Sequence, residues 1–397
     1  MIPAPAMTRF HRCALFLVVA LLAASVPLGA QGAASRPASR PALPGTAEGG
    51  WREWRADPLN SARSHGKVPS FKGLRWKYVA ESGMQASPVV ADGVVYIATK
   101  EGSIHALDFA TGRRIFEKRI TPATLPKEMP KGFGWSTPLV LDDVLVVGSD
   151  EARIYGISRR DGAVLWQVTT GEKVWASPKF DGRLVHVGCL DGKWYAINPK
   201  TGAVEWTLRL GGEIGGSACI VGDEAAVTSR DKKLHLIDLR RGKLITSVDT
   251  GGHSTSTPTL AAGVYCFWPS GGKFTGVDAL SRTTLWKTES LGQYRTSSAT
   301  DGERVYTTGG PFVIAFNPVD GAQLWYSRSG RSFDSSPVSV GDKVVAAGAD
   351  SKLWVFDAAT GAGGEVVDLG EPFAASPAVV DGLCIVSGTS GTVFAIE

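Results

Sequence analysis

The residues best suited to bind a ligand are aromatic and charged side chains that recur in short segments along the chain. These segments read "SGMQA", "KGFGW", "EKVWA", "GEIGG", "GGHST", "GQYRT", "GRSFD" and "GEPFA". Large rings supply apolar contact area, and a few polar groups among them fix the orientation of a ligand. The candidate binding residues are Gln85, Trp135, Lys173, Trp175, His253, Tyr294, Arg295, Phe333, Asp334 and Phe373.

Compact catalytic and metal-binding motifs are missing from the sequence. It contains no GxSxG, HExxH, EF-hand loop, P-loop or GxGxxG. His105 in "IHALD" and His235 in "LHLID" occupy the same position of a repeat that elsewhere holds Tyr155, Tyr195, Thr275, Ile314, Trp354 and Phe394. A position that accepts tyrosine, tryptophan and phenylalanine is a packing position. We therefore predict no catalytic residue and no metal site.

The repeat that positions these residues has a period of about 40 residues. Its start can be read at Pro88, Pro138, Pro178, Ala218, Pro258, Ser298, Pro337 and Pro377, at intervals of 50, 40, 40, 40, 40, 39 and 40 residues. Each unit contains apolar runs separated by Asp-Gly-type turns and usually ends in a run with tryptophan near its middle. Four antiparallel strands joined by tight turns form one blade of a propeller.

The two ends of the repeat region complement each other. The last unit stops at "GTVFAIE", before its fourth strand, and "GLRWKYV" stands before the first unit with Trp76 in the tryptophan position. We therefore predict an all-β fold, an eight-bladed β-propeller of four-stranded antiparallel blades. The N-terminal strand completes the last blade and closes the ring, which removes free sheet edges. The candidate segments then rim one mouth of the central channel, unless their rings merely plug it.

The residues before the propeller divide into two segments. Residues 1–34 have a basic start, the apolar run "CALFLVVALLAASV" and small residues after it, as in a signal peptide. Residues 35–50 are rich in Pro, Ala, Ser and Gly, which is typical of a flexible linker. Residues 51–397 are assigned to the propeller, with Trp51 and Trp54 expected against its outside. An uncleaved membrane anchor is the alternative for the first segment.

Charge and cysteine content narrow the classes of function. The net charge is +4, and removal of residues 1–34 leaves 40 basic and 38 acidic residues, which gives no electrostatic case for binding nucleic acid. Cys189, Cys219, Cys266 and Cys384 form no CxxC motif. We expect buried free thiols, with a Cys189–Cys219 disulfide as the alternative.

The unit "SPVVADGVVYIATKEGSIHALDFATGRRIF" resembles the PQQ-type repeat of quinoprotein-like β-propellers. "YAINPKTGAVEW" and "IAFNPVDGAQLW" match the Asp/Asn-x-x-x-Gly-x-x-x-Trp ending of that repeat, and the resemblance covers residues 76–397. The resemblance implies one of two functions. One branch of the family comprises PQQ-dependent dehydrogenases, which hold the quinone and calcium, and the other comprises BamB-like, non-catalytic scaffolds of outer-membrane protein assembly.

This chain is more similar to the second branch. It lacks the vicinal cysteine pair and the haem segment found among the dehydrogenases. Its acids near the mouth are Glu172, Glu213 and Asp334, which are few for the ligands of a calcium ion. It also departs from BamB, because no cysteine follows the apolar run to carry a lipid.

We therefore expect an exported, soluble, periplasmic or secreted monomer that binds an envelope protein or a small ligand at the channel mouth. We expect no cofactor and no transmembrane segment after signal removal. The alternative is a quinoprotein oxidoreductase that holds PQQ and Ca²⁺ in a central funnel at the channel mouth.

Overall fold

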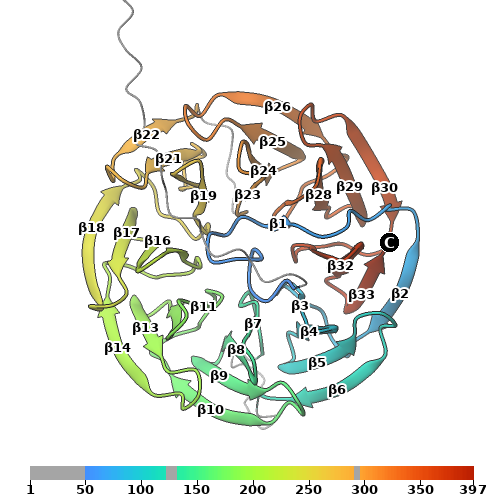
Figure 1. The fold of residues 1–397 in the computed structure, drawn as a ribbon, viewed down its shortest axis with the longest axis horizontal. Coiled ribbons are helices and arrows are strands. Elements are labelled where there is room, and N and C mark those ends of the chain that lie inside the picture. Colours follow the sequence, from blue (N-terminus) through green and yellow to red (C-terminus); the bar gives the residue numbers. More distant parts are fainter. Residues whose placement is uncertain (1–49, 122–131, 290–295) are drawn as a thin grey trace, which may run out of the picture. The chain divides into compact units, whose positions relative to one another are not determined.

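Four-stranded antiparallel sheets follow one another around a central axis (Figure 1). The computed structural model describes residues 50–121, 132–289 and 296–397, and these residues form strands and turns without an α-helix. The innermost strands are β3 (Val89–Ala91), β7 (Leu139–Val140), β11 (Lys179–Phe180), β15 (Cys219–Val221), β19 (Thr259–Ala261), β23 (Ala299–Thr300), β27 (Val338–Val340) and β31 (Ala378–Val380). They are short because the blades converge at the axis.

The other strands lie progressively farther from the axis. The second strands are β4 (Val94–Ala98), β8 (Val144–Ser149), β12 (Val185–Gly188), β16 (Glu224–Thr228), β20 (Val264–Phe267), β24 (Val305–Gly309), β28 (Lys343–Ala347) and β32 (Leu383–Ser387). The third are β5 (Ser103–Asp108), β9 (Arg153–Ser158), β13 (Lys193–Ile197), β17 (Lys233–Asp238), β21 (Thr275–Asp278), β25 (Phe312–Phe316), β29 (Lys352–Asp357) and β33 (Thr392–Ile396). The outermost are β6 (Arg114–Arg119), β10 (Val164–Thr169), β14 (Val204–Arg209), β18 (Lys243–Asp249), β22 (Thr284–Lys287), β26 (Gln323–Arg328), β30 (Gly363–Asp368) and β2 (Leu74–Val79).

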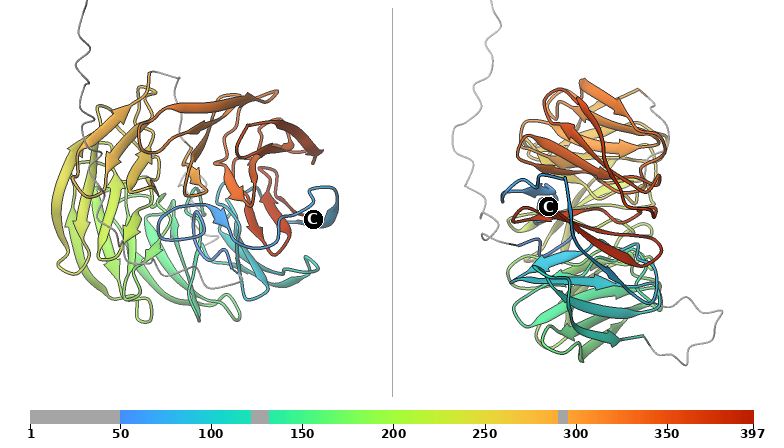
Figure 2. Two further views of the ribbon diagram at one scale, coloured as in Figure 1. Left: turned by 45° about the horizontal axis from the view of Figure 1, so that its top comes forward. Right: turned by 90° about the vertical axis from the view of Figure 1, so that its right-hand side faces the viewer.

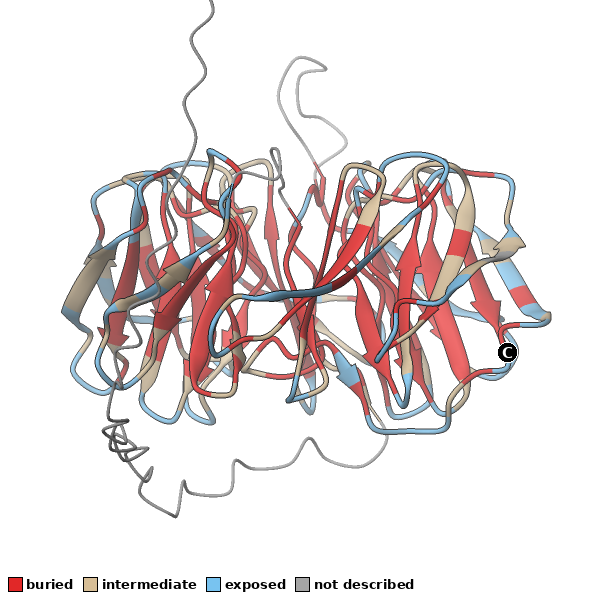
Figure 3. Ribbon diagram, turned by 90° about the horizontal axis from the view of Figure 1, so that it is seen from above, coloured by how far each residue is buried: buried red, intermediate tan, exposed pale blue. Residues whose placement is uncertain are grey.

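The predicted eight blades and the predicted closure of the ring are confirmed. β2 pairs antiparallel with β33, so that the eighth sheet has the order β2-β33-β32-β31. Strands from the two ends of the repeat region thus share one blade (Figure 1). Second and third strands are mostly buried, whereas outermost strands expose much of their length (Figure 3).

The repeat tryptophans wedge between neighbouring blades. The Trp76 indole donates a hydrogen bond to the carbonyl of Phe109 at 2.9 Å, across the seam between the last and first blades. Gly112 packs on the same ring with a φ of 69°, and a Cβ atom there would lie 2.5 Å from Trp76. The glycine of the "ATG" turn is therefore required both by its backbone conformation and by the ring above it.

A closed circle of hydrogen bonds joins the blades at the start of their inner strands. Each blade supplies one serine or threonine, and its backbone N–H donates to the hydroxyl of the next blade at 2.8–3.1 Å. These ring residues are Ser87, Thr137, Ser177, Ser217, Thr257, Ser297, Ser336 and Ser376. Their N–H groups are thus satisfied from blade to blade rather than within a sheet.

Residues 50–66, here called the strap, cross the central channel before the chain reaches β2. Strap carbonyls accept hydrogen bonds from inner-strand N–H groups of six blades, namely those of Val90, Val140, Ile220, Leu260, Thr300 and Ser339. Within the strap, β1 (Arg63–Ser64) pairs in parallel with β27. In Figure 2 this blue segment lies toward one face of the ring.

The strap corrects one expectation from the sequence. Trp51 and Trp54 do not lie against the outside of the ring. Trp51 is buried and exchanges backbone hydrogen bonds with Val90 of β3. The Trp54 indole donates to the Thr257 hydroxyl at 3.3 Å, inside the channel.

The cysteines and the two repeat histidines are buried, as the sequence predicts. Cys189, Cys219, Cys266 and Cys384 are buried free thiols, and the alternative disulfide is not formed. His105 and His235 are buried, as a packing position requires. The predicted signal peptide and all of the linker except Gly50 lie outside the described residues. In the described part of the chain, no helix has the length and apolar character needed to cross a bilayer.

Replacement of Trp76 by alanine tests the seam. We expect Trp76→Ala to lower the free energy of unfolding by about 3–5 kcal/mol, because it removes a buried ring and its hydrogen bond. Leu74→Ala, on the same strand but 48% exposed, should change it by only about 0.5 kcal/mol. Urea denaturation measures both, and equal small losses would contradict the wedge role.

Replacement of one ring residue tests the circle of hydrogen bonds. Ser217→Ala removes the acceptor of the buried Ser177 N–H and should lower the free energy of unfolding by about 1–3 kcal/mol. Ser217→Thr keeps the hydroxyl, as Thr257 does in the next blade, and should be nearly neutral. A circle without energetic importance would make the two variants indistinguishable in the same denaturation experiment.

Candidate functional site

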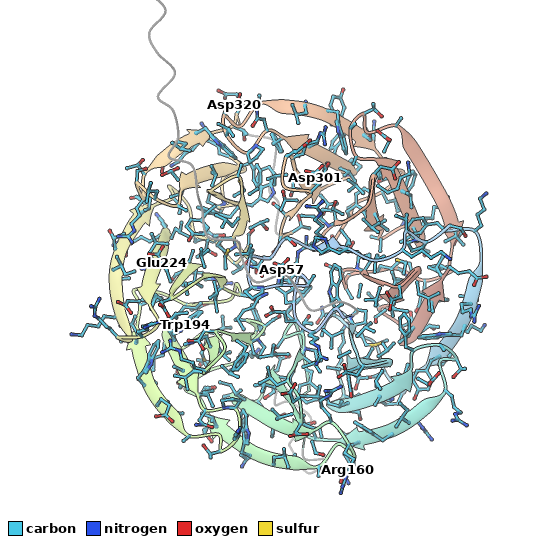
Figure 4. All side chains as sticks on the ribbon, viewed as in Figure 1. Asp57, Arg160, Trp194, Glu224, Asp301 and Asp320 are labelled. Atoms are coloured by element: carbon cyan, nitrogen blue, oxygen red, sulfur yellow. The ribbon has the colours of Figure 1, made fainter. Side chains whose placement is uncertain are left out.

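A cavity of about 350 Å³ opens on the axis at the end of the channel opposite the strap. Its floor includes the ring residues Ser177, Ser217, Thr257, Ser297, Ser336 and Ser376, together with Trp54 of the strap. We call this cavity the funnel. Side chains crowd the axis in Figure 4, where Asp57 of the strap lies near the centre.

The residue two places before each ring residue faces the funnel. In seven blades this mouth position lines the cavity, as Gln85, Trp135, Trp175, Gly215, Thr255, Asp334 and Ala374. The residue one place earlier points into the core, because side chains alternate along an extended chain. Met84, Val174, Ile214, Phe333 and Phe373 occupy that inward position and are at most 2% exposed.

Two neighbouring blades give the mouth an aromatic side. Trp135 is 45% exposed, and the Trp175 indole donates to Asp150 Oδ1 at 2.9 Å. Lys173 Nζ lies 6.0 Å from the centroid of the Trp175 ring, within reach of a cation–π contact. Burial raises the pKa of Asp150, and the hydrogen bond from Trp175 opposes that rise. The Trp175 side chain is thus positioned by a hydrogen bond to Asp150 and by the nearby ammonium group of Lys173.

The remaining mouth is polar or lined by small residues. His253 is exposed, and its Nδ1 lies 3.1 Å from the hydroxyl of Ser270. Arg230 donates to Glu213 at 2.6 Å. Gly215, Thr255 and Ala374 leave open space on the blades that carry them. The funnel is thus asymmetric in its lining, although the scaffold repeats.

The strap beneath the funnel is fixed by buried charges. Lys179 Nζ donates to the carbonyls of Trp54 at 2.5 Å and Asp57 at 2.9 Å, and it lies 3.4 Å from Glu53 Oε2. Burial raises the pKa of Glu53 to about 7, while the charge of Lys179 opposes the rise. Burial also lowers the pKa of Arg55 to about 9. These side chains are placed where an ion pair and carbonyl groups replace water.

Channel carbonyls are capped from the strap. Arg55 Nη2 donates to the carbonyls of Ser298 and Pro337, both at 2.6 Å. Asn60 Nδ2 donates to those of Ala218 and Pro258, both at 2.8 Å. All four carbonyls belong to the residues that follow ring residues, so the strap lies directly under the circle. Arg55 and Asn60 adopt φ angles of 64° and 58°, a strained conformation that these hydrogen bonds help to hold.

The structure separates the sequence-predicted site residues into groups. Gln85, Trp135, Trp175, His253 and Asp334 line the funnel. Lys173 contacts it through Trp175. Phe333 and Phe373 are buried and pack edge-on against Trp354 and Phe394 of their own blades. Tyr294 and Arg295 lie outside the described residues.

Sequence reasoning missed three contributors. Asp150 and Arg230 come from the hairpin turns between the second and third strands of their blades, which lie beside the mouth. Their charges at the tips of "GSDEARI" and "TSRDKK" were the available signal. Trp54 comes from the strap, whose sequence does not repeat. The serine or threonine at the start of every unit was visible, but its role in joining the blades was not.

Eight four-stranded sheets around an axis that carries a funnel define an eight-bladed β-propeller. Residues 66–128, 121–306 and 270–397 match the family described as outer membrane protein assembly factor BamB. The chain belongs to this family.

The similar individual proteins include both a dehydrogenase and BamB. The chain is 32% identical over 108 residues to 1-butanol dehydrogenase (cytochrome c) of Thauera butanivorans, covering 25% of this chain and 15% of that protein. It is 29% identical over 96 residues to outer membrane protein assembly factor BamB of Xanthomonas campestris pv. campestris, covering 24% of each. The matched segments thus span a quarter or less of either relative.

A solved structure shows the same fold. The quinohemoprotein alcohol dehydrogenase of Comamonas testosteroni superposes with a TM-score of 0.74 over 87% of this chain and 80% of its own, at 15% sequence identity. At that identity the likeness establishes the architecture and leaves the activity open.

Removal of Lys179 tests how the strap is held. Lys179→Ala leaves the buried Glu53 carboxylate without its ion partner, which should cost about 3–5 kcal/mol. We expect the strap to detach and trypsin to cut between Arg52 and Lys67 much faster than in the wild type. Lys200→Ala, an exposed site on the same blade, should leave the rate unchanged. Equal cutting rates in the two variants would contradict this role.

Proposed function

We propose that this chain is an exported, non-catalytic binding scaffold that receives a segment of an envelope protein in its funnel. The observation that carries the proposal is the exposed Trp135 beside Trp175 at the mouth. Large aromatic residues in a concave surface are typical of residues that dominate protein binding. The surrounding Gln85, His253 and Asp334 supply a polar rim.

The family supports a role in envelope or outer-membrane protein assembly. The matching family and the Xanthomonas relative are both described as outer membrane protein assembly factor BamB. A rigid ring that needs no movement to present its mouth suits a protein that holds a partner. We propose a soluble periplasmic or secreted protein that acts as a monomer without a cofactor in the funnel.

A quinoprotein oxidoreductase is the second candidate, because the butanol and quinohemoprotein alcohol dehydrogenases are comparably similar. The residues of the funnel do not fit the calcium ion that this activity implies. Ca²⁺ takes roughly six to eight oxygen ligands, with carboxylates prominent among them. Among the described residues that line the funnel, Asp334 is the one carboxylate.

Capture of envelope proteins by the immobilised chain tests the proposal. We expect the proteins retained from an envelope extract to be lost from the Trp135→Ala, Trp175→Ala double variant. Each truncation should cost about 2 kcal/mol or more, or roughly 30-fold in affinity. Tyr326→Ala removes an aromatic side chain that is 61% exposed on the outer strand β26 and should retain capture.

Two outcomes would overturn the proposal. One is equal capture by the wild type and the double variant, which would place binding elsewhere on the ring. The other is stoichiometric uptake of PQQ with calcium, followed by reduction of a dye in the presence of an alcohol, which would favour the oxidoreductase.

A further inference from the structure

Ring closure gathers three potential metal ligands beside the seam between the last and first blades. Glu81 follows β2, and His105 and Glu117 lie on β5 and β6. One ligand atom from each residue lies within 4.8 Å of the other two. Within residues 50–121, 132–289 and 296–397, no second group of His, Cys, Asp or Glu side chains meets this criterion.

The central member of the group is His105, whose side chain is fully buried. Its Nε2 lies 2.7 Å from Glu81 Oε2, so the imidazole and the carboxylate are in direct contact. A cation bound between the two atoms would replace this contact with two metal–ligand bonds.

Neighbouring residues orient both ligands. His105 Nδ1 lies 2.9 Å from the Tyr78 hydroxyl, and Glu81 Oε1 accepts a hydrogen bond from the Thr99 hydroxyl at 2.7 Å. These contacts occupy the atoms that face away from the group and leave Nε2 and Oε2 directed into it. Outer partners of this kind fix the tautomer and rotamer of metal ligands.

Blade 1 differs here from its sister blades. In four other blades, the aromatic or imidazole side chain at the position of His105 forms a hydrogen bond with an acidic residue four places earlier. These pairs are Glu151–Tyr155, Asp191–Tyr195, Asp231–His235 and Asp350–Trp354. The corresponding Glu101 lies 3.7 Å from Arg119 instead. His105 faces Glu81 from another strand end and Glu117 across the β5–β6 pair. Two carboxylates therefore converge on one histidine in this blade.

We propose that Glu81, His105 and Glu117 bind a first-row divalent cation such as Zn²⁺, which ties the closing strand to the first blade. One imidazole and two carboxylates are ligands that zinc accepts. The Glu81 and Glu117 side chains are 32% and 35% exposed, which leaves water room to complete the coordination. Arg114 pairs with Glu117 at the surface, and a divalent cation can displace this weak exposed pair.

This site is separate from the funnel and does not depend on the proposed function. From the sequence, His105 is expected to fill a packing position and to bind no metal. The carboxylates that the closed ring brings to it lie apart from it in sequence and give no local motif. The group forms only when β2 has joined the last blade, so the metal would bind the closed ring and stabilise it.

Titration of metal-free protein with zinc chloride tests the inference. We expect one saturable site per chain by calorimetry and a thermal midpoint that rises with zinc concentration. Glu117→Gln changes an exposed carboxylate, and His105→Tyr introduces the residue that blades 2 and 3 hold at this position. Each variant should weaken zinc binding by about tenfold or more and abolish the rise in thermal midpoint.

The matched control is His235→Tyr, which changes the same position in a blade with one carboxylate partner. It should bind zinc as the wild type does. The inference is overturned if the wild type binds no zinc, or if Glu117→Gln binds it with unchanged affinity. If His105→Tyr does not fold, the zinc affinity of Glu117→Gln is sufficient to test the inference. Loss of binding in His235→Tyr would likewise overturn it by placing the metal in blade 4.

Discussion

The circle of N–H to hydroxyl hydrogen bonds around the axis is the constraint on which the rest of the structure depends. At the start of an inner strand the blades converge, and the backbone N–H has no partner within its own sheet. The hydroxyl of the next blade supplies that partner eight times, from Ser87 round to Ser376 and back to Ser87. A buried N–H left without an acceptor would cost about 1–3 kcal/mol. The bonds therefore couple each blade to the next, and the circle closes only when all eight blades are in place.

The same circle explains why one end of the channel is filled and the other is open. Below it, carbonyls such as that of Pro258 face the axis and need donors, which Arg55 and Asn60 provide from the strap. Above it, the hydroxyls already accept the ring N–H groups, so the mouth does not require a covering segment. The mouth positions hold different residue types from blade to blade, including Trp135 and Asp334.

The fold could be predicted from the sequence because its determinants are local and repeated. A period of about 40 residues, turn glycines such as Gly112 and the Trp76 position were sufficient for eight blades and for the closing strand. The candidate site was only partly predictable. Trp175 and Phe333 look alike in sequence, but they stand one place apart relative to their ring residues and therefore face opposite ways.

The strap could not be predicted, for a physical reason. Its sequence does not repeat and has no apolar periodicity, and its conformation follows from hydrogen bonds to carbonyls and N–H groups of distant blades. Glu53 and Lys179 are far apart in sequence, and each reads as an ordinary surface residue until the ring places them together. The group around His105 was missed for the same reason, because Glu81 reaches it only through closure.

Amide hydrogen exchange at the ring residues tests the closed circle most directly. Protection reports the free energy needed to break each hydrogen bond. If the circle is continuous, the amide of Ser376, whose hydrogen bond to the Ser87 hydroxyl crosses the seam, exchanges as slowly as those of Ser177 and Ser217, far from either chain end. Exchange at the seam that is orders of magnitude faster, with protection elsewhere, would show an open ring and contradict the account.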